Sequence, residues 1–404
     1  MPGLQIELQE IKKLKQFYKL MDQTREIRFK LVGDIFNRQA IEPESVESLK
    51  NALAVLENIP AKHSRQILLV DDSKQIKVDL TYETDELKKD IYYLENGEDK
   101  FIQYLDTVHA DFKQHVNKGV DKLKGLHFNC LISDRDGTTN NYCGRYRSSI
   151  QSIYNSVFLT RFAVKKAVNP IIVTSAPLKD PGIVDVSVNP EKTIIYAASK
   201  GREFIDLTGT RRSYPVDDEK QALLTRLNDK LVKMVNTQEY EKYSLIGSGL
   251  QLKFGQTTIA RQDISNSIGE EESLKFLSVI KTVVSELDPE HKNFRIEDTG
   301  LDVEIILTID DKLSGSKDFD KADAVKYLDS QLSLNLDKGP HLVCGDTASD
   351  VPMITAAMES TKDTYSIFVT KKEELAQNVR AICPGAIIVP EPDMLVTIMG
   401  LLST

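Results

Sequence analysis

Residues 127–138 read HFNCLISDRDGT, a short apolar run that ends directly in a polar loop with two aspartates and a glycine. The run predicts a buried parallel strand that delivers Asp134 and Asp136 to the carboxyl edge of a sheet. The same form returns as NPIIVTSAP at 169–177 and as GPHLVCGDTASD at 339–350. Two more apolar runs and two helical patterns continue the alternation: 367–370, 386–390, 344–360 and 372–380. This order predicts an open α/β sheet whose ligands bind where the strands end.

The residues before this sheet are predicted to form a mostly helical module. Apolar side chains recur at spacings of three and four over 4–35, which is typical of an amphipathic helix. A second helix is predicted at 43–58, and helical spacing returns over 84–124 with an interruption at Asn96-Gly97. Residues 65–82 look more like a short hairpin or an irregular excursion.

The stretch from about 185 to 315 differs from the rest of the sheet domain. It holds β-like runs such as TIIYAAS at 193–199 and two helical patterns near 217–237 and 270–288. We interpret it as an α+β insertion into the sheet domain. The predicted division is therefore a helical domain, a core in two pieces and an insertion: 1–124, then 125–184 with 316–404, and 185–315.

Composition limits the classes of function. A chain of 404 residues predicts two or three domains, and 41% apolar residues with mixed charges indicate an ordinary folded protein. A net charge of −9 argues against nucleic acid or an anionic membrane as the main partner. No run approaches the ~20 apolar residues of a membrane span, and the first residues do not resemble a secretory signal. Four scattered cysteines without a CxxC pair favour reduced thiols, so we expect a cytoplasmic protein.

The strongest chemical signal is Asp134-Arg135-Asp136-Gly137-Thr138. Two carboxylates at positions i and i+2 after a strand can converge on one site. Asp134 could then attack phosphorus, and Asp136 could protonate a leaving alkoxide and later take a proton from water. Gly137 would let the backbone approach a phosphate closely. A lone motif of this kind is also common in ordinary surface loops.

Asp346 and Asp350 follow the third strand-like run. With Asp134 and the main-chain carbonyl of Asp136 they would form an oxygen-only Mg²⁺ site, because Mg²⁺ prefers carboxylate and carbonyl ligands. Hard ligands and only six histidines make zinc a poor fit. The alternative is that 346–349 only cap a helix that begins near Asp350, and capping and metal binding can coexist.

Two further residues are candidate phosphate ligands. Thr174 ends the second strand-like run and would offer a hydroxyl to a phosphate oxygen. Lys321, at a predicted helix start, would balance the charge of Asp134 and the phosphate. Taken singly, a threonine here is ordinary turn chemistry and a lysine is ordinarily solvated.

The ordered set of candidates resembles the four signature motifs of the haloacid dehalogenase superfamily: Asp134/Asp136, Thr174, Lys321 and Asp346/Asp350. An aspartate at 136 resembles the phosphatases and phosphomutases of that superfamily more than its transport ATPases. The insertion between Thr174 and Lys321 is where a type 2 cap lies. The resemblance implies an α/β fold with a haloacid-dehalogenase-like Rossmannoid core, an α+β type 2 cap and an N-terminal helical bundle.

Longer strings resemble the trehalose-6-phosphate phosphatases of the nematode type: DRDGTTNNYCGRY, TRFA, VTSAPLKDPGIVD, KGREF, IGSGLQLK and CGDTASDVPM. This resemblance implies that the cap reads the sugar, with contacts from Glu203, Lys253 and Glu304. Arg261 is a looser candidate, because ARQD replaces a more common histidine–tyrosine–arginine string. Gln251 stands where many relatives have glutamate. Solvated charges on cap strands would give the same sequence pattern.

The resemblance therefore implies a Mg²⁺-dependent phosphatase that hydrolyses trehalose 6-phosphate, with a phosphosugar as its small-molecule substrate. One alternative is the same chemistry on sucrose 6-phosphate or glucosylglycerol phosphate. Another is a scaffold protein with a degenerate phosphatase domain. The helical module could pack on the core, self-associate or bind a partner, and the first two are favoured.

Overall fold

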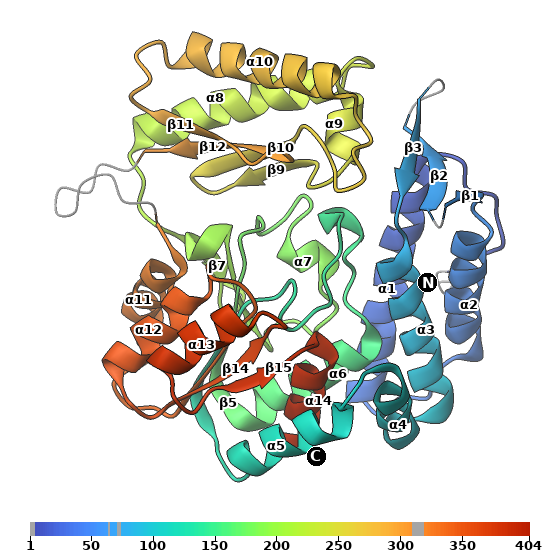
Figure 1. Ribbon diagram of the computed structural model, residues 1–404, viewed down its shortest axis with the longest axis vertical. Helices are drawn as coiled ribbons and strands as arrows, with labels where there is room; N and C mark the ends of the chain where they lie inside the picture. Colours follow the sequence, from blue (N-terminus) through green and yellow to red (C-terminus); the bar gives the residue numbers. More distant parts are fainter. Residues whose placement is uncertain (1–4, 64, 71–73, 309–318) are drawn as a thin grey trace.

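The computed structural model describes residues 5–63, 65–70, 74–308 and 319–404. Three parts are visible in Figure 1: a core built on a large sheet, a second sheet with its own helices above the core, and an N-terminal helical module beside both. The fold is α/β, and it has the predicted core, inserted sheet and helical bundle. No helix among the described ranges combines the length and the apolar character needed to cross a bilayer.

Among the described residues, the core sheet has eight strands in the order β15-β14-β13-β4-β5-β6-β7-β8. Pairing is parallel from β15 to β6 and antiparallel from β6 to β8. The strands are β4 (Phe128–Ser133), β5 (Ala167–Val173), β6 (Ile195–Ala198), β7 (Glu203–Ile205), β8 (Arg211–Ser213), β13 (His341–Gly345), β14 (Thr364–Val369) and β15 (Ile387–Val389).

Helices cover both faces of this sheet, which explains why its central strands read as continuous apolar runs. On β4, Leu131 packs in one apolar cluster and Cys130 and Ile132 in another. The core helices are α6 (Ile153–Lys166), α7 (Ile183–Val186), α11 (Lys321–Leu332), α12 (Val351–Ser360), α13 (Glu373–Ile382) and α14 (Pro392–Leu402). Because both faces are buried, polar chemistry is confined to the strand ends.

The second sheet is antiparallel, in the order β11-β12-β10-β9. Its elements are α8 (Asp218–Val235), α9 (Glu241–Leu245), β9 (Leu250–Lys253), β10 (Gln256–Ala260), α10 (Glu270–Leu287), β11 (Phe294–Asp298) and β12 (Asp302–Leu307). Figure 1 places α8 and α10 on the side of this sheet that faces away from the core. We call this unit the cap. The predicted return to the core at 315–316 lies outside the described residues.

The predicted insertion, 185–315, contains three strands that belong to the core sheet. Strand β6, read from sequence as a β-like run of the insertion, pairs with β5 in the core sheet, and β7 and β8 extend that sheet. Four buried or half-buried residues in β6 fit either a core strand or a cap strand. Only the pairing partner distinguishes them, and local sequence does not encode it.

In its described residues, the N-terminal module has five helices and a small antiparallel sheet of three strands: α1 (Leu14–Phe36), α2 (Pro43–Glu57), β1 (Ala61–Lys62), β2 (Arg65–Leu69), β3 (Gln75–Val78), α3 (Thr81–Asn96), α4 (Glu98–Val108) and α5 (Phe112–Leu123). The β2–β3 hairpin and the break at Gly97 agree with the sequence analysis. A further break at His109–Asp111 separates α4 from α5, and Asp111 there adopts a left-handed backbone conformation.

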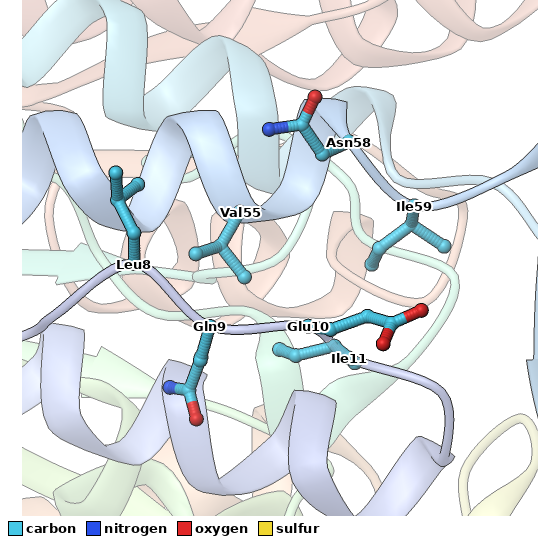
Figure 2. A pocket seen from close by; sticks show the side chains of 7 residues that line it. All are labelled: Leu8, Gln9, Glu10, Ile11, Val55, Asn58 and Ile59. Atoms are coloured by element: carbon cyan, nitrogen blue, oxygen red, sulfur yellow. The ribbon is translucent and has the colours of Figure 1, made fainter.

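The first predicted helix starts later than expected. Residues 5–13 are extended and run beside α2, where Leu8 and Ile11 flank Val55 (Figure 2). The Leu69 amide donates to the Lys12 carbonyl at 2.8 Å, and the Gln16 side chain accepts from the amides of residues 12 and 13. These bonds satisfy the backbone in an extended form, so the helix begins at Leu14.

Candidate active site

Three neighbouring strands of the core sheet bring the predicted motifs to one edge. Strand β4 lies between β13 and β5, and these strands end just before Asp134, Asp346 and Thr174. The Asp134 amide donates to the Cys344 carbonyl at 3.0 Å, which ties the first two loops together. The edge opens into a cleft of about 280 Å³, lined by all six predicted catalytic and metal residues: Asp134, Asp136, Thr174, Lys321, Asp346 and Asp350.

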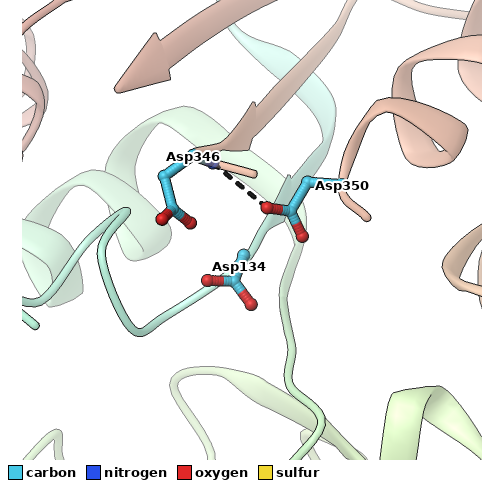
Figure 3. A group of neighbouring side chains, drawn as sticks. All are labelled: Asp134, Asp346 and Asp350. Atoms are coloured by element: carbon cyan, nitrogen blue, oxygen red, sulfur yellow. Dashed lines mark hydrogen bonds between the residues drawn. The ribbon is translucent and has the colours of Figure 1, made fainter. Parts of the chain in front are cut away.

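The carboxylates of Asp134, Asp346 and Asp350 converge in this cleft (Figure 3), with one oxygen of each lying within 4.8 Å of the others. The amides of Asp346 and Thr347 donate to Asp350 Oδ2 at 3.1 and 2.9 Å. Asp350 therefore closes its own loop at the N-terminus of α12, where Pro352 stands in the first turn. Helix capping and a cluster of acidic ligands coexist here.

Crowding and burial perturb the pKa values of this cluster. Burial, aided by repulsion from Asp350, raises the pKa of Asp134 to about 6 although Lys321 opposes the shift. Burial and the charges of Asp134 and Asp350 raise the pKa of Asp346 to about 7. Burial would also raise the pKa of Asp350, but the ion pair with Lys321 holds it below its ordinary value. The cluster thus favours any bound cation.

The Lys321 ammonium group places a positive charge of the protein itself among these carboxylates. It begins α11, is only 4% exposed, and donates to Asp134 Oδ1 at 2.6 Å and to Asp350 Oδ1. Burial alone would lower the pKa of Lys321, but the two aspartates raise it above its ordinary value, so the lysine stays charged. The adjacent Asp320 caps α11 by accepting from the amides of residues 322 and 323, and so fixes where this helix starts.

Gly137 and Thr138 bring the first loop against the third. Gly137 has φ of +90°, and a Cβ placed on it would lie 2.3 Å from Asp346 Oδ2. The Thr138 hydroxyl lies 2.8 Å from Asp346 Oδ1 and 3.3 Å from Asp134 Oδ2. A side chain at 137 would therefore separate the two carboxylates. Sequence reasoning noted the turn at Gly137 but assigned no role to Thr138.

Asp136 and Thr174 take the places expected from the sequence. Asp136 lines the cleft beside Asp134 and receives a hydrogen bond from Arg135 through its Oδ1 atom. Thr174 is buried at the end of β5, where its hydroxyl accepts from the Ala176 amide at 3.2 Å. That hydroxyl can donate its proton to an anion in the cleft.

The residues of this cluster fit a divalent metal ion. Three buried or half-buried carboxylates with raised or constrained pKa values offer only oxygen, which suits a hard cation. Within the described part of the chain, no histidine or cysteine belongs to the group. The buried aspartate triad could therefore hold a metal.

The cap contributes two of its predicted sugar contacts to the cleft. Gln251 and Lys253, two residues apart on β9, both line it. Thr258 of β10 pairs with Gln251 and with Glu304 of β12, so these side chains lie on the same face of the cap sheet. Burial lowers the pKa of Lys253 to about 8, and the nearby Glu304 opposes that shift. Gln251 and Lys253 thus line the same cleft as the carboxylates of Asp134, Asp346 and Asp350.

Glu203 and Arg261 are placed differently. Glu203 belongs to β7 of the core sheet, is buried, and bonds to Ser199 and Arg211. Arg261 is buried within the cap, where it pairs with Asp298 and contacts the Ser273 hydroxyl at 2.7 Å. Neither residue lines the cleft, and Glu304 is also absent from the lining. These interactions hold neighbouring elements together.

Sequence reasoning also missed residues that line the cleft: Tyr142, Cys143, Gly144, Tyr146, Ser175, Ala176, Ser248, Thr347 and Ser349. Tyr142 is 69% exposed, unusual for an aromatic side chain, and lies in the loop that follows the first motif. Its place in that loop was the only available signal, because an exposed tyrosine cannot be told from a buried one by sequence.

The aspartate pair after a central strand, the lysine at a helix start and the acidic loop after the adjacent strand meet in one cleft of an α/β protein. Comparisons with known families assign the chain to one of them. The model described as "Trehalose-6-phosphate phosphatase, C-terminal" matches residues 131–395, and the "Trehalose-6-phosphate phosphatase N-terminal helical bundle domain" matches 13–112. The chain belongs to the trehalose-6-phosphate phosphatase family.

The curated proteins similar to this chain are named either trehalose-phosphate synthases or trehalose-phosphatases. An "Alpha,alpha-trehalose-phosphate synthase [UDP-forming] 2" of Aphelenchoides avenae is 32% identical over 94% of this chain and 30% of its own length. A "Trehalose-phosphatase" of Brugia malayi is 30% identical over 62% of this chain and 51% of its own length. The chain thus spans about a third of the length of the first curated relatives that it matches.

A solved structure described as a "trehalose-6-phosphate phosphatase related protein" is 15% identical, with a TM-score of 0.46, over 68% of this chain and 96% of its own.

Proposed function

We propose that this chain is a Mg²⁺-dependent phosphatase that hydrolyses trehalose 6-phosphate to trehalose and phosphate. The observation that carries the proposal is the contact of Asp134 with Lys321 in a cleft shared with Asp346 and Asp350. Membership of the trehalose-6-phosphate phosphatase family supports the choice of sugar.

In the first step, the Asp134 carboxylate attacks phosphorus and the bond to the sugar oxygen breaks. Because burial raises its pKa only to about 6, Asp134 is largely ionised at neutral pH and available as a nucleophile. Asp136 donates its proton to the departing alkoxide, so free trehalose leaves as an alcohol. The enzyme is left with a phosphoryl group on Asp134.

In the second step, water attacks the phosphoryl group. The Asp136 carboxylate takes a proton from that water, the bond between phosphorus and Asp134 breaks, and inorganic phosphate leaves. Lys321 and the Thr174 hydroxyl hold the phosphoryl oxygens throughout, and the lysine offsets their negative charge. When bound by Asp134, Asp346, Asp350 and the main-chain carbonyl of Asp136, Mg²⁺ supplies further positive charge to those oxygens.

The cap supplies the sugar contacts in this proposal. Lys253 donates to sugar hydroxyls, and Gln251 donates and accepts. Glu304, on β12 with β10 between it and Lys253, favours the charged form of that lysine. A polar sheet face above the carboxylates suits a polyol better than an apolar substrate. The cap also excludes bulk water from the phosphoryl group, so its opening is expected to influence turnover.

The test is a panel of phosphosugars assayed for phosphate release with and without Mg²⁺. Trehalose 6-phosphate should be hydrolysed with the highest kcat/KM, and chelation of the metal should remove the activity. Sucrose 6-phosphate and glucosylglycerol phosphate test the alternative of another phosphosugar. Equal rates on all three would refute the choice of trehalose, and no release from any would favour a scaffold with a degenerate phosphatase domain.

A further inference from the structure

Helix α3 of the N-terminal module buries charged side chains against the catalytic core. Glu83, Glu86 and Asp90 lie on one face of the helix, and all three are at most 2% exposed. Burying carboxylates is costly unless each is paired or hydrogen-bonded. We therefore expect the three carboxylates of this helix to hold neighbouring groups in defined positions, which apolar packing alone would not do.

Two side chains of α3 form hydrogen bonds with the segment 148–150, which lies between the first motif and α6. Glu83 Oε1 accepts from the Ser148 hydroxyl at 2.6 Å. The Tyr82 hydroxyl donates to the Ile150 carbonyl at 2.9 Å. Ser149 is thus held from both sides by neighbours that α3 binds.

The same segment is also tied to the first motif by the residues around it. The Arg145 guanidinium donates to Glu83 at 3.0 Å, and the Asn140 amide donates to the Tyr82 hydroxyl at 2.8 Å. The loop from Asn140 to Ile150 therefore has α3 contacts near its start, its middle and its end. This loop carries Tyr142 and three further residues of the cleft wall.

Ser149 in turn holds the arginine between the two catalytic aspartates. Arg135 is buried, and its guanidinium donates to the Ser149 hydroxyl at 3.1 Å and to the Ser149 carbonyl. The same guanidinium donates to Asp136 Oδ1. A planar group fixed at two points presents its remaining donor in one direction, so the orientation of Asp136 follows from the position of Ser149.

We propose that α3 positions the acid/base Asp136 through a hydrogen-bonded chain that runs from Tyr82 and Glu83, through residues 148–150, to Arg135. This inference rests on the proposed role of Asp136. Tyr82, Glu83 and Arg135 are positioning residues in this chain. The N-terminal module is accordingly a part of the active-site framework, and separation from the core would impair proton transfer even with Asp134, Lys321 and the metal ligands in place.

The leaving group distinguishes this role from simple stabilisation of the fold. A sugar alkoxide departs only when an acid protonates it, whereas nitrophenolate is a good leaving group and departs without a proton. Misplacing Asp136 should therefore lower kcat/KM, which reports only the steps up to departure of the leaving group, far more for trehalose 6-phosphate than for p-nitrophenyl phosphate. A general loss of folded protein would lower both rates equally.

The experiment compares three variants of the full chain on these two substrates at saturating Mg²⁺. E83Q removes the charge that holds Ser148 and Arg145. Y82F removes only a hydroxyl, which donates to Ile150 and accepts from Asn140. E98Q is the matched control, because Glu98 also joins the module to the core, through both terminal nitrogens of Arg161, but makes none of the bonds in the chain. Urea midpoints measure the stability of each variant.

We expect E83Q to lower kcat/KM for trehalose 6-phosphate about tenfold or more, since small misplacements of catalytic groups have effects of that size. The same variant should change kcat/KM for the nitrophenyl ester less than about twofold. Y82F should shift the ratio of the two rates in the same direction by a smaller factor. E98Q should leave the ratio unchanged even where it lowers the urea midpoint. If E83Q does not fold, Y82F decides, because it keeps the ring.

D136N provides the benchmark for this ratio. If D136N lowers kcat/KM equally for both substrates, the proposed role of Asp136 as the general acid fails and the inference falls with it. If D136N selectively slows the sugar ester but E83Q and Y82F leave the ratio at the wild-type value, the positioning inference alone is overturned.

Discussion

Replacing Lys321 with methionine leaves Asp134 and Asp350 buried without the ammonium group that contacts both. The three side chains are 5%, 10% and 1% exposed, so water cannot replace the lost ion pairs. Removing one partner of a buried ion pair costs about 3–5 kcal/mol. Methionine keeps most of the apolar volume, so this cost should not include a large cavity. Loss of positive charge beside the phosphoryl group should also lower kcat about 10²–10³-fold.

The stability loss is best measured by urea unfolding with a chelator present, followed by circular dichroism because the chain has no tryptophan. Lys326 to methionine is the matched control, since this lysine lies on the same helix and pairs with Glu359 at 3.8 Å, with both side chains 63% exposed. An exposed pair of this kind contributes about 0–1 kcal/mol.

The contribution of this cluster to the free energy of unfolding depends on pH. The folded-state pKa values of Asp134 and Asp346 are raised to about 6 and about 7, so the folded protein binds more protons than the unfolded one between about pH 4 and pH 7. Stability from this cluster therefore falls as pH rises through that window. The Lys321 variant should be closer to wild type at pH 5 than at pH 7.5. A loss no larger than that of the Lys326 variant would refute the counter-ion role.

Three smaller changes test other parts of the site. Asp346→Asn should unfold at a higher urea concentration than wild type at pH 7 without metal, because a neutral side chain relieves the repulsion, and should be inactive in a phosphate-release assay; a lower urea midpoint would contradict this. With Lys253 at a pKa of about 8, kcat/KM of the wild-type protein for trehalose 6-phosphate should fall as pH rises through 8. Lys253→Gln should raise KM about tenfold and remove that pH dependence. A variant with the same pH profile as wild type would exclude the role of Lys253. Gly137→Ala should lower kcat more than Gly125→Ala, because both positions have positive φ but only at 137 does a Cβ meet a carboxylate; equal effects would leave backbone strain as the sole cause.

The sequence predicted the catalytic edge well because strand order there follows from simple rules. Apolar runs that end in Asp134, Thr174 and Asp346 must be buried strands, and the ends of parallel strands meet at one sheet edge. Lys321 was placed by its motif rather than by its surroundings, since its partners lie 187 and 29 residues away in the chain. The structure brings all of these residues to one cleft.

The cap and the first helix show where local pattern is insufficient. Strand β6 has only four residues, all apolar, so its membership of the core sheet depends on the distant β5 rather than on its own residues. Residues 5–13 carry helical spacing, but hydrogen bonds to Leu69 and to the Gln16 side chain stabilise an extended form. In both cases a tertiary partner outweighs a weak local preference.

The cap residues illustrate a different limit. Charged residues on antiparallel strands either face a ligand or pair with each other, and the sequence cannot tell which. Lys253 lines the cleft, whereas Arg261 pairs with Asp298 inside the cap. The chain from Glu83 to Arg135 was also invisible in the sequence, because it joins a helix of the N-terminal module to a motif about fifty residues further along.

Rapid acid quenching of the enzyme during turnover of trehalose 6-phosphate, followed by peptide mass spectrometry, tests the central chemistry most directly. A phosphoryl group should appear on the peptide that contains Asp134 in the wild-type protein and be absent from Asp134→Asn, which should also release no phosphate. Phosphoryl transfer to a different residue, or turnover by Asp134→Asn at a rate near that of wild type, would contradict the assignment of the nucleophile.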